Sequence, residues 1–364
     1  MSARRPGSSI NGKDTGIDPA TSTGTAFSGT LAPELDGGSK VELAPEMGPY
    51  QIAWRRLRRN RVALGFGLLF ILIVVLCLLA PVYASDVAHT TPYANHVTDT
   101  VQVGGKTVDV VSLTGLPVGP TWHGRFFLGA DANGRDVAVR LLYGGRNSLE
   151  IGGVATLITI VLGLLAGIVA GYFRGFADGL ISRLLEVIWA YPVIVFGAAV
   201  GVIINVGGLD LGFVKLNGGT LLVPAIIIGI VYIPYVARPV RGKVLSVRGL
   251  DFVDAARQQG LGHMRIMAGE ILPNVTTLAI VMIPLQLAQS ILLEAALSFL
   301  GAGVQSPNPS WGTMIGDGTR LIPGAIHLTL VPGTMLVLCV LGINIFGDGV
   351  RDALDPRAKL RIER

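Results

Sequence analysis

The chain has 364 residues, of which 51% are hydrophobic and 15% are charged. Soluble globular domains carry about 25% charged residues, so this composition excludes an ordinary soluble enzyme, a disordered chain and a nucleic-acid-binding protein. Its 49 glycines are more typical of membrane helices than of a soluble α/β fold. The formal charge of +5 is therefore interpreted through membrane topology rather than through affinity for an acidic substrate.

The N-terminal segment, residues 1–50, differs from the rest of the chain. It is rich in Gly, Ser, Thr and Pro and contains no apolar core segment, which predicts a disordered tail. A basic start followed by about 7–15 apolar residues, the pattern of a cleavable signal peptide, is missing. We expect deletion of this tail to be tolerated.

Six uncharged, apolar segments follow, each at or above the roughly 20 residues that a helix needs to cross the hydrocarbon core. Because a chain in lipid must satisfy its own backbone hydrogen bonds, these segments predict six transmembrane helices and an all-α integral membrane protein. The six segments are Val62–Ala84, Ile151–Phe173, Val187–Leu209, Leu216–Ala237, Ile271–Leu293 and Leu321–Gly347.

Lysine and arginine residues predict the orientation of these segments. If the first segment starts inside, the inner segments beyond the tail contain 18 basic residues and the outer segments contain seven. Cytoplasmic loops carry the excess of Lys and Arg, so both termini are expected in the cytoplasm. The five arginines between Arg55 and Arg61 are expected to anchor the first span to anionic lipid headgroups.

The long outer segment, residues 85–147, contains a signal for a β-hairpin around Gly104-Gly105. The residues that alternate with polar ones on either side are Val101, Val103, Val108 and Val110. The Gly-Lys-Thr sequence at 105–107 resembles the end of a phosphate-binding loop. However, Thr100 stands where that motif needs glycine, and a strand pattern follows instead of a helix. A nucleotide site is therefore not expected here.

The most informative inner segment lies between the fourth and fifth predicted spans, and it predicts a short helix. Asp254 suits the first turn, where a carboxylate faces the positive end of the helix dipole, and Ala255 and Ala256 combine high helix propensity with little bulk. Gly260 is placed to end the helix, because glycine tolerates the left-handed conformation. Pro273 suits the first turn of the next span. We expect a compact helical projection at the membrane surface that fits a groove of a cytosolic partner.

The same residues resemble the cytoplasmic coupling-loop signature of ABC importer permeases. The resemblance is carried by Asp254-Ala255-Ala256, by Gly260 and by Ile271-Leu272-Pro273. The first position is Asp, where the family usually has Glu, and this keeps the charge while shortening the side chain. The residues that the resemblance implies for coupling to an ATPase are Asp254, Ala255, Ala256, Gly260, Leu272 and Pro273. An ordinary amphipathic surface helix between two spans is the alternative interpretation.

Other motifs resemble the dipeptide and oligopeptide branch of this family, in particular its C-type permease subunit. The similarity extends from about Trp54 to Arg357 and leaves the N-terminal tail outside it. The motifs are Trp54–Asn60, Leu128–Asp131, Gly134–Val137, Arg140–Arg146, Leu293–Gly301, Pro309–Gly312, Gly347–Gly349 and Asp355–Arg357. The implied cargo is a di- or oligopeptide. Nickel or a nickel chelate is the alternative, because related permeases of this branch serve both.

The resemblance implies a type I ABC importer (MetI-like) permease fold in the bacterial inner membrane. The tail at 1–50 is then cytoplasmic and precedes an N-terminal permease region with the first span. The implied regions are 51–84 for that N-terminal region, 85–147 for an extracytoplasmic loop, 148–350 for the core domain, 239–270 within it for the coupling loop, and 351–364 for a cytoplasmic tail. The implied partners are a homologous permease, two cytoplasmic ATPase domains, an extracytoplasmic solute-binding protein and membrane lipid. No cofactor, metal ion or nucleic acid is expected.

The chain lacks a complete phosphate loop and the motifs of zinc proteases and serine hydrolases. It is therefore not expected to be an enzyme, and ATP hydrolysis is expected in separate subunits. A secondary transporter or channel is an alternative from another class, but such proteins usually carry ionisable residues inside the membrane. Five of the six predicted spans contain none, and the sixth contains only His327, which is expected to be an interfacial polar residue.

Two further polar positions have two interpretations each. Glu294 lies just after the fifth predicted span. It is either a candidate pathway or gate residue or an interfacial carboxylate that bonds the following loop. Arg135 and Asp136, beside Gly134, could bind a substrate group, but a structural role that fixes the outer loop against the second span is favoured.

Overall fold

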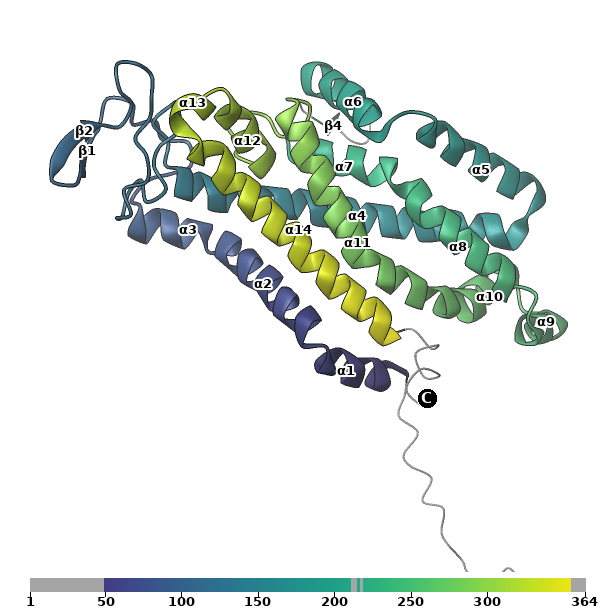
Figure 1. Ribbon diagram of the computed structural model, residues 1–364. Coiled ribbons are helices and arrows are strands. Elements are labelled where there is room, and N and C mark those ends of the chain that lie inside the picture. The colour runs from purple at the N-terminus through teal and green to yellow at the C-terminus, as the bar shows by residue number, and fades with distance from the viewer. Residues whose placement is uncertain (1–48, 211–214, 217–218, 355–364) are drawn as a thin grey trace, which may run out of the picture. The chain divides into compact units, whose positions relative to one another are not determined.

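The computed structural model describes residues 49–210, 215–216 and 219–354. The predicted tail at 1–50 and the predicted tail at 351–364 therefore lie largely outside the described residues. The described part consists mainly of long helices that run side by side, with short helices and two short antiparallel strand pairs at their ends (Figure 1).

The first predicted span agrees with a run of helices at the start of the described chain. Asn60 separates the first two helices and caps the second, because its Oδ1 accepts a hydrogen bond from the amide of Ala63 at 3.0 Å. The elements are α1 (Pro49–Arg59), α2 (Arg61–Leu78), α3 (Ala80–Val82) and a π-helix over Tyr83–Val87. Of these, α2 is long and apolar enough to cross a membrane.

The β-hairpin of the outer segment is confirmed. Strand β1 (Thr100–Val103) pairs antiparallel with β2 (Lys106–Asp109), and Val103 is the partner of Lys106 across the turn. The two turn residues, Gly104 and Gly105, have φ angles of +57° and +78°. This left-handed conformation at both positions is the reason that two glycines stand there.

The second span begins before the apolar segment that predicted it. Helix α4 covers Val137–Phe173, whereas the uncharged sequence starts at Ile151. Charged residues interrupt the apolar pattern in the first part of α4 without interrupting the helix, because Arg146 and Glu150 stay exposed and the outer segment covers Arg140. Arg140, for example, is only 3% exposed and donates a hydrogen bond through Nη1 to the carbonyl of Pro92 at 3.1 Å. Residues 137–147, which the sequence placed in the outer loop, are therefore helical.

Asp136 has the structural contacts that the sequence favoured. Its Oδ1 accepts a hydrogen bond from the amide of Val139 at 3.0 Å, which caps α4. Its Oδ2 accepts a hydrogen bond from the amide of Phe126 at 2.5 Å, which ties the outer segment to the start of the helix. Burial raises the pKa of the Asp136 carboxyl group above its usual value, and the backbone hydrogen bonds oppose this effect.

The third predicted span, Val187–Leu209, is broken in the structure. It is divided between α5 (Gly175–Trp189) and α6 (Val193–Gly207), which differ in direction by 86°. Pro192 stands at the break, where it has no amide to donate to a continuous helix. Among the described residues, five helices are long and apolar enough to cross a membrane, or six if this bent pair counts as one span.

The fourth predicted span continues past its expected end. Helices α7 and α8 together form one candidate span, which reaches Val247 instead of Ala237. Residues 239–247, which the sequence placed in the coupling loop, are therefore helical. The elements of this region are β3 (Leu209–Asp210), β4 (Lys215–Leu216), α7 (Leu222–Val231) and α8 (Ile233–Val247).

The last two predicted spans are present, and both are longer than expected. Helix α11 continues to Phe299, so it includes Glu294, and α14 continues to Leu354. The complete helices therefore include ionisable residues, such as Glu294, that lie outside the predicted apolar segments. The elements are α9 (Asp251–Gln258), α10 (His263–Ile266), a π-helix over Met267–Ile271, α11 (Leu272–Phe299), α12 (Trp311–Thr319), α13 (Ile322–Ala325) and α14 (His327–Leu354).

Helices α4 and α8 approach closely along a row of glycines. A Cβ atom added to each of these glycines would stand 2.7 Å from an atom of the facing helix. The facing pairs are Gly163 with Val236, Gly167 with Val240 and Gly171 with Val244. In lipid, where no hydrophobic force drives helices together, such close packing of small residues stabilises helix pairs.

Replacing Gly167 by leucine is expected to destabilise the protein by about 1–3 kcal/mol, because the new side chain must push α8 away. Gly153 is the matched control, since it lies on the same helix and nothing stands within 4 Å of its Cβ position. Thermal unfolding of the purified variants in detergent measures the effect. Equal midpoints for Gly167→Leu and Gly153→Leu would contradict the close packing.

The inner and outer loops predicted from the sequence lie at opposite ends of the long helices. Figure 1 shows α9 and α10 at one end of α4 and α8, and the β1–β2 hairpin, α12 and α13 toward the other end. This arrangement agrees with an inner segment and an outer segment on opposite faces of a membrane.

Candidate functional site

The short helix α9 forms at the segment that the sequence singled out. Asp251 and Asp254 lie in its first turn, where carboxylates interact favourably with the helix dipole. Ala256 is only 5% exposed and faces the protein, whereas Asp254 and Ala255 are exposed. The helix therefore exposes Asp254 and Ala255 and buries Ala256 against its neighbours.

Gly260 ends this helix through its backbone conformation. Its φ angle of +77° is left-handed, and its amide donates a hydrogen bond to the carbonyl of Arg257 at 2.9 Å. The amide of Leu261 donates to the carbonyl of Ala256 at 3.2 Å, which completes a Schellman motif. Nothing stands within 4 Å of the Cβ position of Gly260, so this position faces open space.

The buried side of α9 attaches it to three membrane helices. Val253 and Ala256 belong to an apolar cluster to which α4, α8 and α11 contribute. Other members of the cluster are Tyr172 on α4, Val240 and Val244 on α8, Ile266 and Met267, Ile271 at the N-cap of α11, and Val275 within α11. Because close-packed side chains deform little, a displacement of α9 is expected to pass to the ends of these helices.

Polar contacts centred on Tyr172 strengthen this attachment. Arg248 donates through Nη1 to the carbonyl of Tyr172 at 2.6 Å, and the Tyr172 hydroxyl lies 2.9 Å from Nδ1 of His263. Arg257 pairs with Asp254 at 2.7 Å, and its guanidinium lies 5.8 Å from the centre of the Tyr172 ring. Desolvation, followed by repulsion from neighbouring arginines, lowers the pKa of Arg248 below its usual value. Tyr172, Arg248 and His263 could not be identified from the sequence, because they come from separate segments without a shared motif.

Several apolar side chains around α9 are exposed. Met264 is the most exposed of them at 75%. We call the set the α9 surface; it consists of Leu250, Phe252, Met264 and Leu272. Pro273 is also exposed, in the first turn of α11, directly after the buried Ile271. Exposed apolar residues gathered at a helix end are typical of a surface that binds another protein.

Comparison with known proteins identifies the family. The family model described as "Binding-protein-dependent transport system inner membrane component" matches residues 163–360, which is more than half of the chain and includes α9. The chain belongs to this family of permeases. A second model, described as the N-terminal transmembrane domain of oligopeptide transport permease C, matches residues 48–100 of the permease.

Relatives of known name are similar over most of their length. The permease is 32% identical to the dipeptide transport system permease protein DppC of Alkalihalophilus pseudofirmus, over 90% of this chain and 97% of that protein. It is 36% identical to the di/tripeptide transport system permease protein DppC of Pseudomonas aeruginosa, over 85% of this chain and 93% of that protein. It is 32% identical to the glutathione transport system permease protein GsiD of Pectobacterium atrosepticum, over 85% of this chain and 92% of that protein.

Among solved structures, the permease is similar to an inward-facing conformation of the MetNI methionine ABC transporter. The TM-score is 0.48, with 19% sequence identity over 59% of this chain and 96% of that chain. Membership of the family makes the protein a multi-pass component of the bacterial inner membrane and a transporter permease of a binding-protein-dependent importer, not an enzyme. The family also implies an ATPase and a substrate-binding protein as partners.

Glu294 lies inside α11 of the permease, and its side chain is fully buried. Its Oε1 accepts a hydrogen bond from the hydroxyl of Ser298 at 2.7 Å, and Ser298 Oγ accepts one from the amide of Val304 at 3.0 Å. Its Oε2 is buried without a hydrogen bond, although the hydroxyls of Ser148 and Ser310 lie close to the carboxyl group. The carboxyl group thus joins α11 to α4 and to the loop that follows α11. These contacts favour the structural interpretation, and a pathway role remains a prediction.

His327 is the first residue of α14, near the outer end of that span. Its Nε2 is buried without a hydrogen bond. In the part of the chain that the structure describes, no group of three or more His, Cys, Asp or Glu side chains is arranged to hold a metal ion.

Proposed function

We propose that this permease forms, together with a homologous permease, the translocation path for di- and oligopeptides. Separate ATPase subunits bind its cytoplasmic face, an extracytoplasmic binding protein delivers the cargo, and membrane lipid covers the apolar outer faces of the helices. The observation that carries the proposal is the short exposed helix α9, whose buried side belongs to an apolar cluster shared with α4, α8 and α11.

The α9 surface and the helix that it borders are the docking region for the ATPase in this proposal. Asp254 and Ala255 face outward, and Gly260 leaves open space at the helix end, so a groove of the partner can approach the backbone. Leu272 and Pro273 contribute from the first turn of α11, while Ala256 holds the helix against α4 and α8. These residues supply both the contact and the attachment that coupling requires.

Movement of α9 is transmitted to the path by packing. Closure of the ATPases on ATP binding displaces α9, and the shared apolar cluster carries the inner ends of α4, α8 and α11 with it. The path then changes from inward-open to outward-open, because ATP binding favours one of two arrangements. This mechanism needs no hydrolytic group in the permease itself.

The names of the relatives support peptides as the cargo. Two relatives are described as dipeptide or di/tripeptide permeases and one as a glutathione permease, at 32–36% identity over at least 85% of this chain. All three descriptions name short peptides.

Reconstitution of the complete importer tests the function. We expect proteoliposomes that contain both permeases and the ATPases to accumulate a labelled dipeptide only when ATP and the binding protein are present, because each partner supplies one step. The measurement is ATP-dependent uptake, with a nickel chelate as the alternative cargo. Uptake of nickel without uptake of peptides would contradict the proposed cargo, and peptide uptake without ATP would contradict the importer mechanism.

A further inference from the structure

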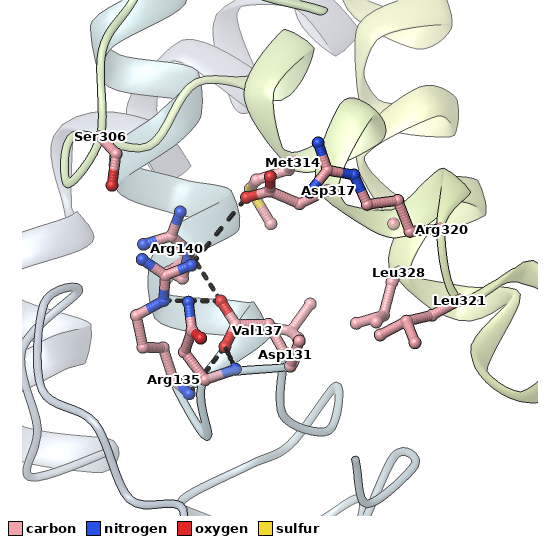
Figure 2. A pocket seen from close by; sticks show the side chains of 13 residues that line it. Asp131, Arg135, Val137, Arg140, Ser306, Met314, Asp317, Arg320, Leu321 and Leu328 are labelled. Carbon is pink, nitrogen blue, oxygen red and sulfur yellow. Dashed lines mark hydrogen bonds and ion pairs between the residues drawn. The ribbon is translucent and has the colours of Figure 1, made fainter. Parts of the chain in front are cut away.

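A pocket at the outer end of the permease gathers three arginines. The cavity has a volume of about 360 Å³, which lies within the range of small-ligand sites, and it opens between the outer segment, the start of α4 and α12 (Figure 2). Its charged lining residues are Asp131, Arg135, Arg140, Asp317 and Arg320. Figure 2 shows Arg135 and Arg140 on one side of the pocket and Asp317 and Arg320 on the other.

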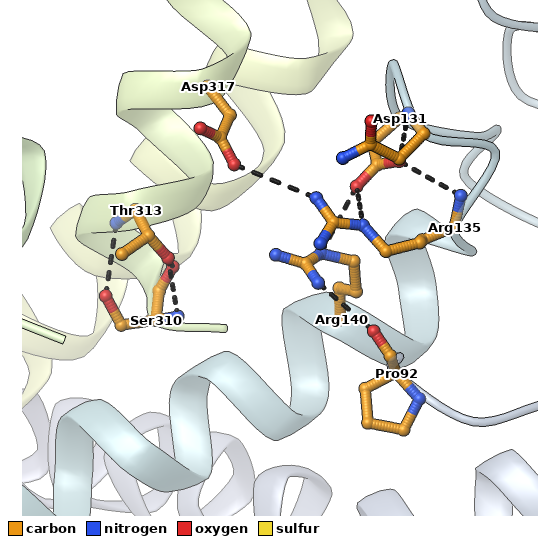
Figure 3. Close-up of polar contacts among 8 residues, drawn as sticks. Pro92, Asp131, Arg135, Arg140, Ser310, Thr313 and Asp317 are labelled. Atoms are coloured by element: carbon orange, nitrogen blue, oxygen red, sulfur yellow. Dashed lines mark hydrogen bonds and ion pairs between the residues drawn. The ribbon is translucent and has the colours of Figure 1, made fainter. Parts of the chain in front are cut away.

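The two buried arginines share one carboxylate oxygen. Oδ2 of Asp131 lies 2.7 Å from Nε of Arg135 and 3.4 Å from Nε of Arg140 (Figure 3). Oδ1 of Asp131 already accepts hydrogen bonds from the amides of Asn133 and Arg135 at 2.9 and 3.0 Å. A single carboxylate cannot neutralise two guanidinium groups, so positive charge remains at the buried end of the pocket.

Asp317 offsets this positive charge only through a long ion pair with Arg135. Its Oδ2 lies 3.9 Å from Nη2 of Arg135, beyond hydrogen-bond distance, and its side chain is 60% exposed. Arg320 is exposed near the same carboxylate and forms no ion pair with any residue that the structure describes. The pocket therefore contains three guanidinium groups and two carboxylates, which leaves a formal charge of +1.

One guanidinium is already oriented for a ligand. Arg140 uses Nη1 to donate to the carbonyl of Pro92 at 3.1 Å, which holds the side chain in place, and its Nη2 makes no hydrogen bond to a described residue. The rest of the lining includes the apolar side chains of Met314, Leu321 and Leu328. A complementary ligand carries a carboxylate beside an apolar group, because guanidinium binds carboxylate in a planar, paired geometry.

We propose that this pocket binds the terminal carboxylate of a peptide on the extracytoplasmic side of the permease. Arg140 and Arg320 bind the carboxylate, and Met314, Leu321 and Leu328 contact the last side chain of the peptide. Arg135 is a positioning residue that Asp131 holds in place. This inference rests on the proposed peptide transport and adds to it the chemical group by which the permease recognises its cargo.

Photo-crosslinking in proteoliposomes of the complete importer tests the pocket. The probe is a tripeptide with a photoreactive leucine at its last position, prepared with a free terminal carboxylate or as the terminal amide. We expect the acid to label pocket residues such as Met314 about tenfold more than the amide does, because a charge-assisted pair is lost with the amide. Mass spectrometry of the labelled permease gives the site and the yield.

Variants of two exposed arginines distinguish binding in the pocket from a general effect of surface charge on labelling. Arg320→Gln is expected to lower labelling by the acid about tenfold, to the level of the amide. Arg320→Lys is expected to retain part of the labelling, because it keeps the charge. Arg146→Gln is the matched control, since Arg146 is exposed on α4 and is not among the lining residues, and it is expected to leave labelling unchanged.

Two results would overturn the inference. One is equal labelling of the pocket by the acid and the amide, and the other is unchanged labelling in Arg320→Gln. Uptake of the same peptides by the same vesicles tests the proposed function separately. Vesicles that accumulate neither peptide contradict peptide transport, whereas vesicles that accumulate both without selective labelling contradict only the pocket.

Discussion

Replacement of Gly260 by aspartate is expected to abolish the stimulation of ATP hydrolysis by the loaded binding protein, while the permease still inserts and assembles. Gly260 has a φ angle of +77°, and a residue with a side chain is strained there by about 1–2 kcal/mol. The added carboxylate extends into open space, where the ATPase docks in our proposal. Coupling free energies of about 1–3 kcal/mol correspond to roughly 5–150-fold effects, so we expect a loss of stimulation within this range.

Two variants distinguish the causes of this loss. Gly262→Asp adds the same charge close to Gly260, but Gly262 has a φ angle of −66° and also faces open space. It is expected to keep most of the stimulation, because aspartate is favourable at that helix cap. Gly260→Ala adds strain without charge and is expected to give an intermediate loss. ATPase activity in the reconstituted complex is the measurement.

The coupling role would be contradicted if Gly260→Asp were stimulated as strongly as the unmodified permease. Equal losses in Gly260→Asp and Gly262→Asp would show that the added charge, rather than the end of α9, causes the defect. Copurification of each variant with the ATPase subunits separates a loss of docking from a loss of transmission after docking.

Replacement of Glu294 by alanine is expected to destabilise the permease by about 2–4 kcal/mol. The substitution leaves a cavity between α11 and α4 and removes the acceptor of the Ser298 hydroxyl at 2.7 Å. It also leaves the hydroxyls of Ser148 and Ser310 without the nearby carboxyl group. Glu294→Gln keeps the volume and most of the hydrogen bonds, so a loss of about 1 kcal/mol is expected. Thermal unfolding of the purified complex measures both effects.

Uptake at a temperature where the variants are folded decides between the two interpretations of Glu294. If the residue is structural, Glu294→Gln takes up several different peptides at close to the unmodified rate. A loss of uptake without a loss of thermal stability would instead assign Glu294 to the path. Glu150→Ala is the control, because Glu150 is an exposed carboxylate on α4 and its removal is expected to change stability by less than about 0.5 kcal/mol.

Local features of this permease could be predicted because neighbouring residues determine them. The two glycines at 104–105 and the glycine at 260 adopt the left-handed conformations that their positions in the pattern required. The first-turn position of Asp254 in α9 likewise depends on a helix dipole within a few residues. The broad arrangement of membrane helices followed from composition, because lipid offers the backbone no hydrogen-bond partners outside the chain.

The ends of the helices and the environment of polar residues could not be predicted in this way. The apolar segments start at Ile151 and end at Leu293, whereas α4 begins earlier and α11 ends later. Arg140 and Glu294 lie in these extensions, where distant segments bury them. Arg140 is buried and donates a hydrogen bond to the carbonyl of Pro92. The carboxyl group of Glu294 lies close to hydroxyls from α4 and from the cap of α12. The break at Pro192 was also missed, since proline occurs in membrane helices that remain continuous.

For this permease, the amino-acid sequence alone was sufficient to predict the class of protein, the number of apolar segments and the short helix that ends at Gly260. Only the tertiary structure shows that Tyr172, Arg248 and His263 attach this helix to the membrane helices, and that Arg140 and Arg320 line one pocket. The difference has a physical origin. Backbone hydrogen bonds and turn conformations are satisfied locally, whereas burial and charge pairing depend on which distant side chains the packed helices bring together.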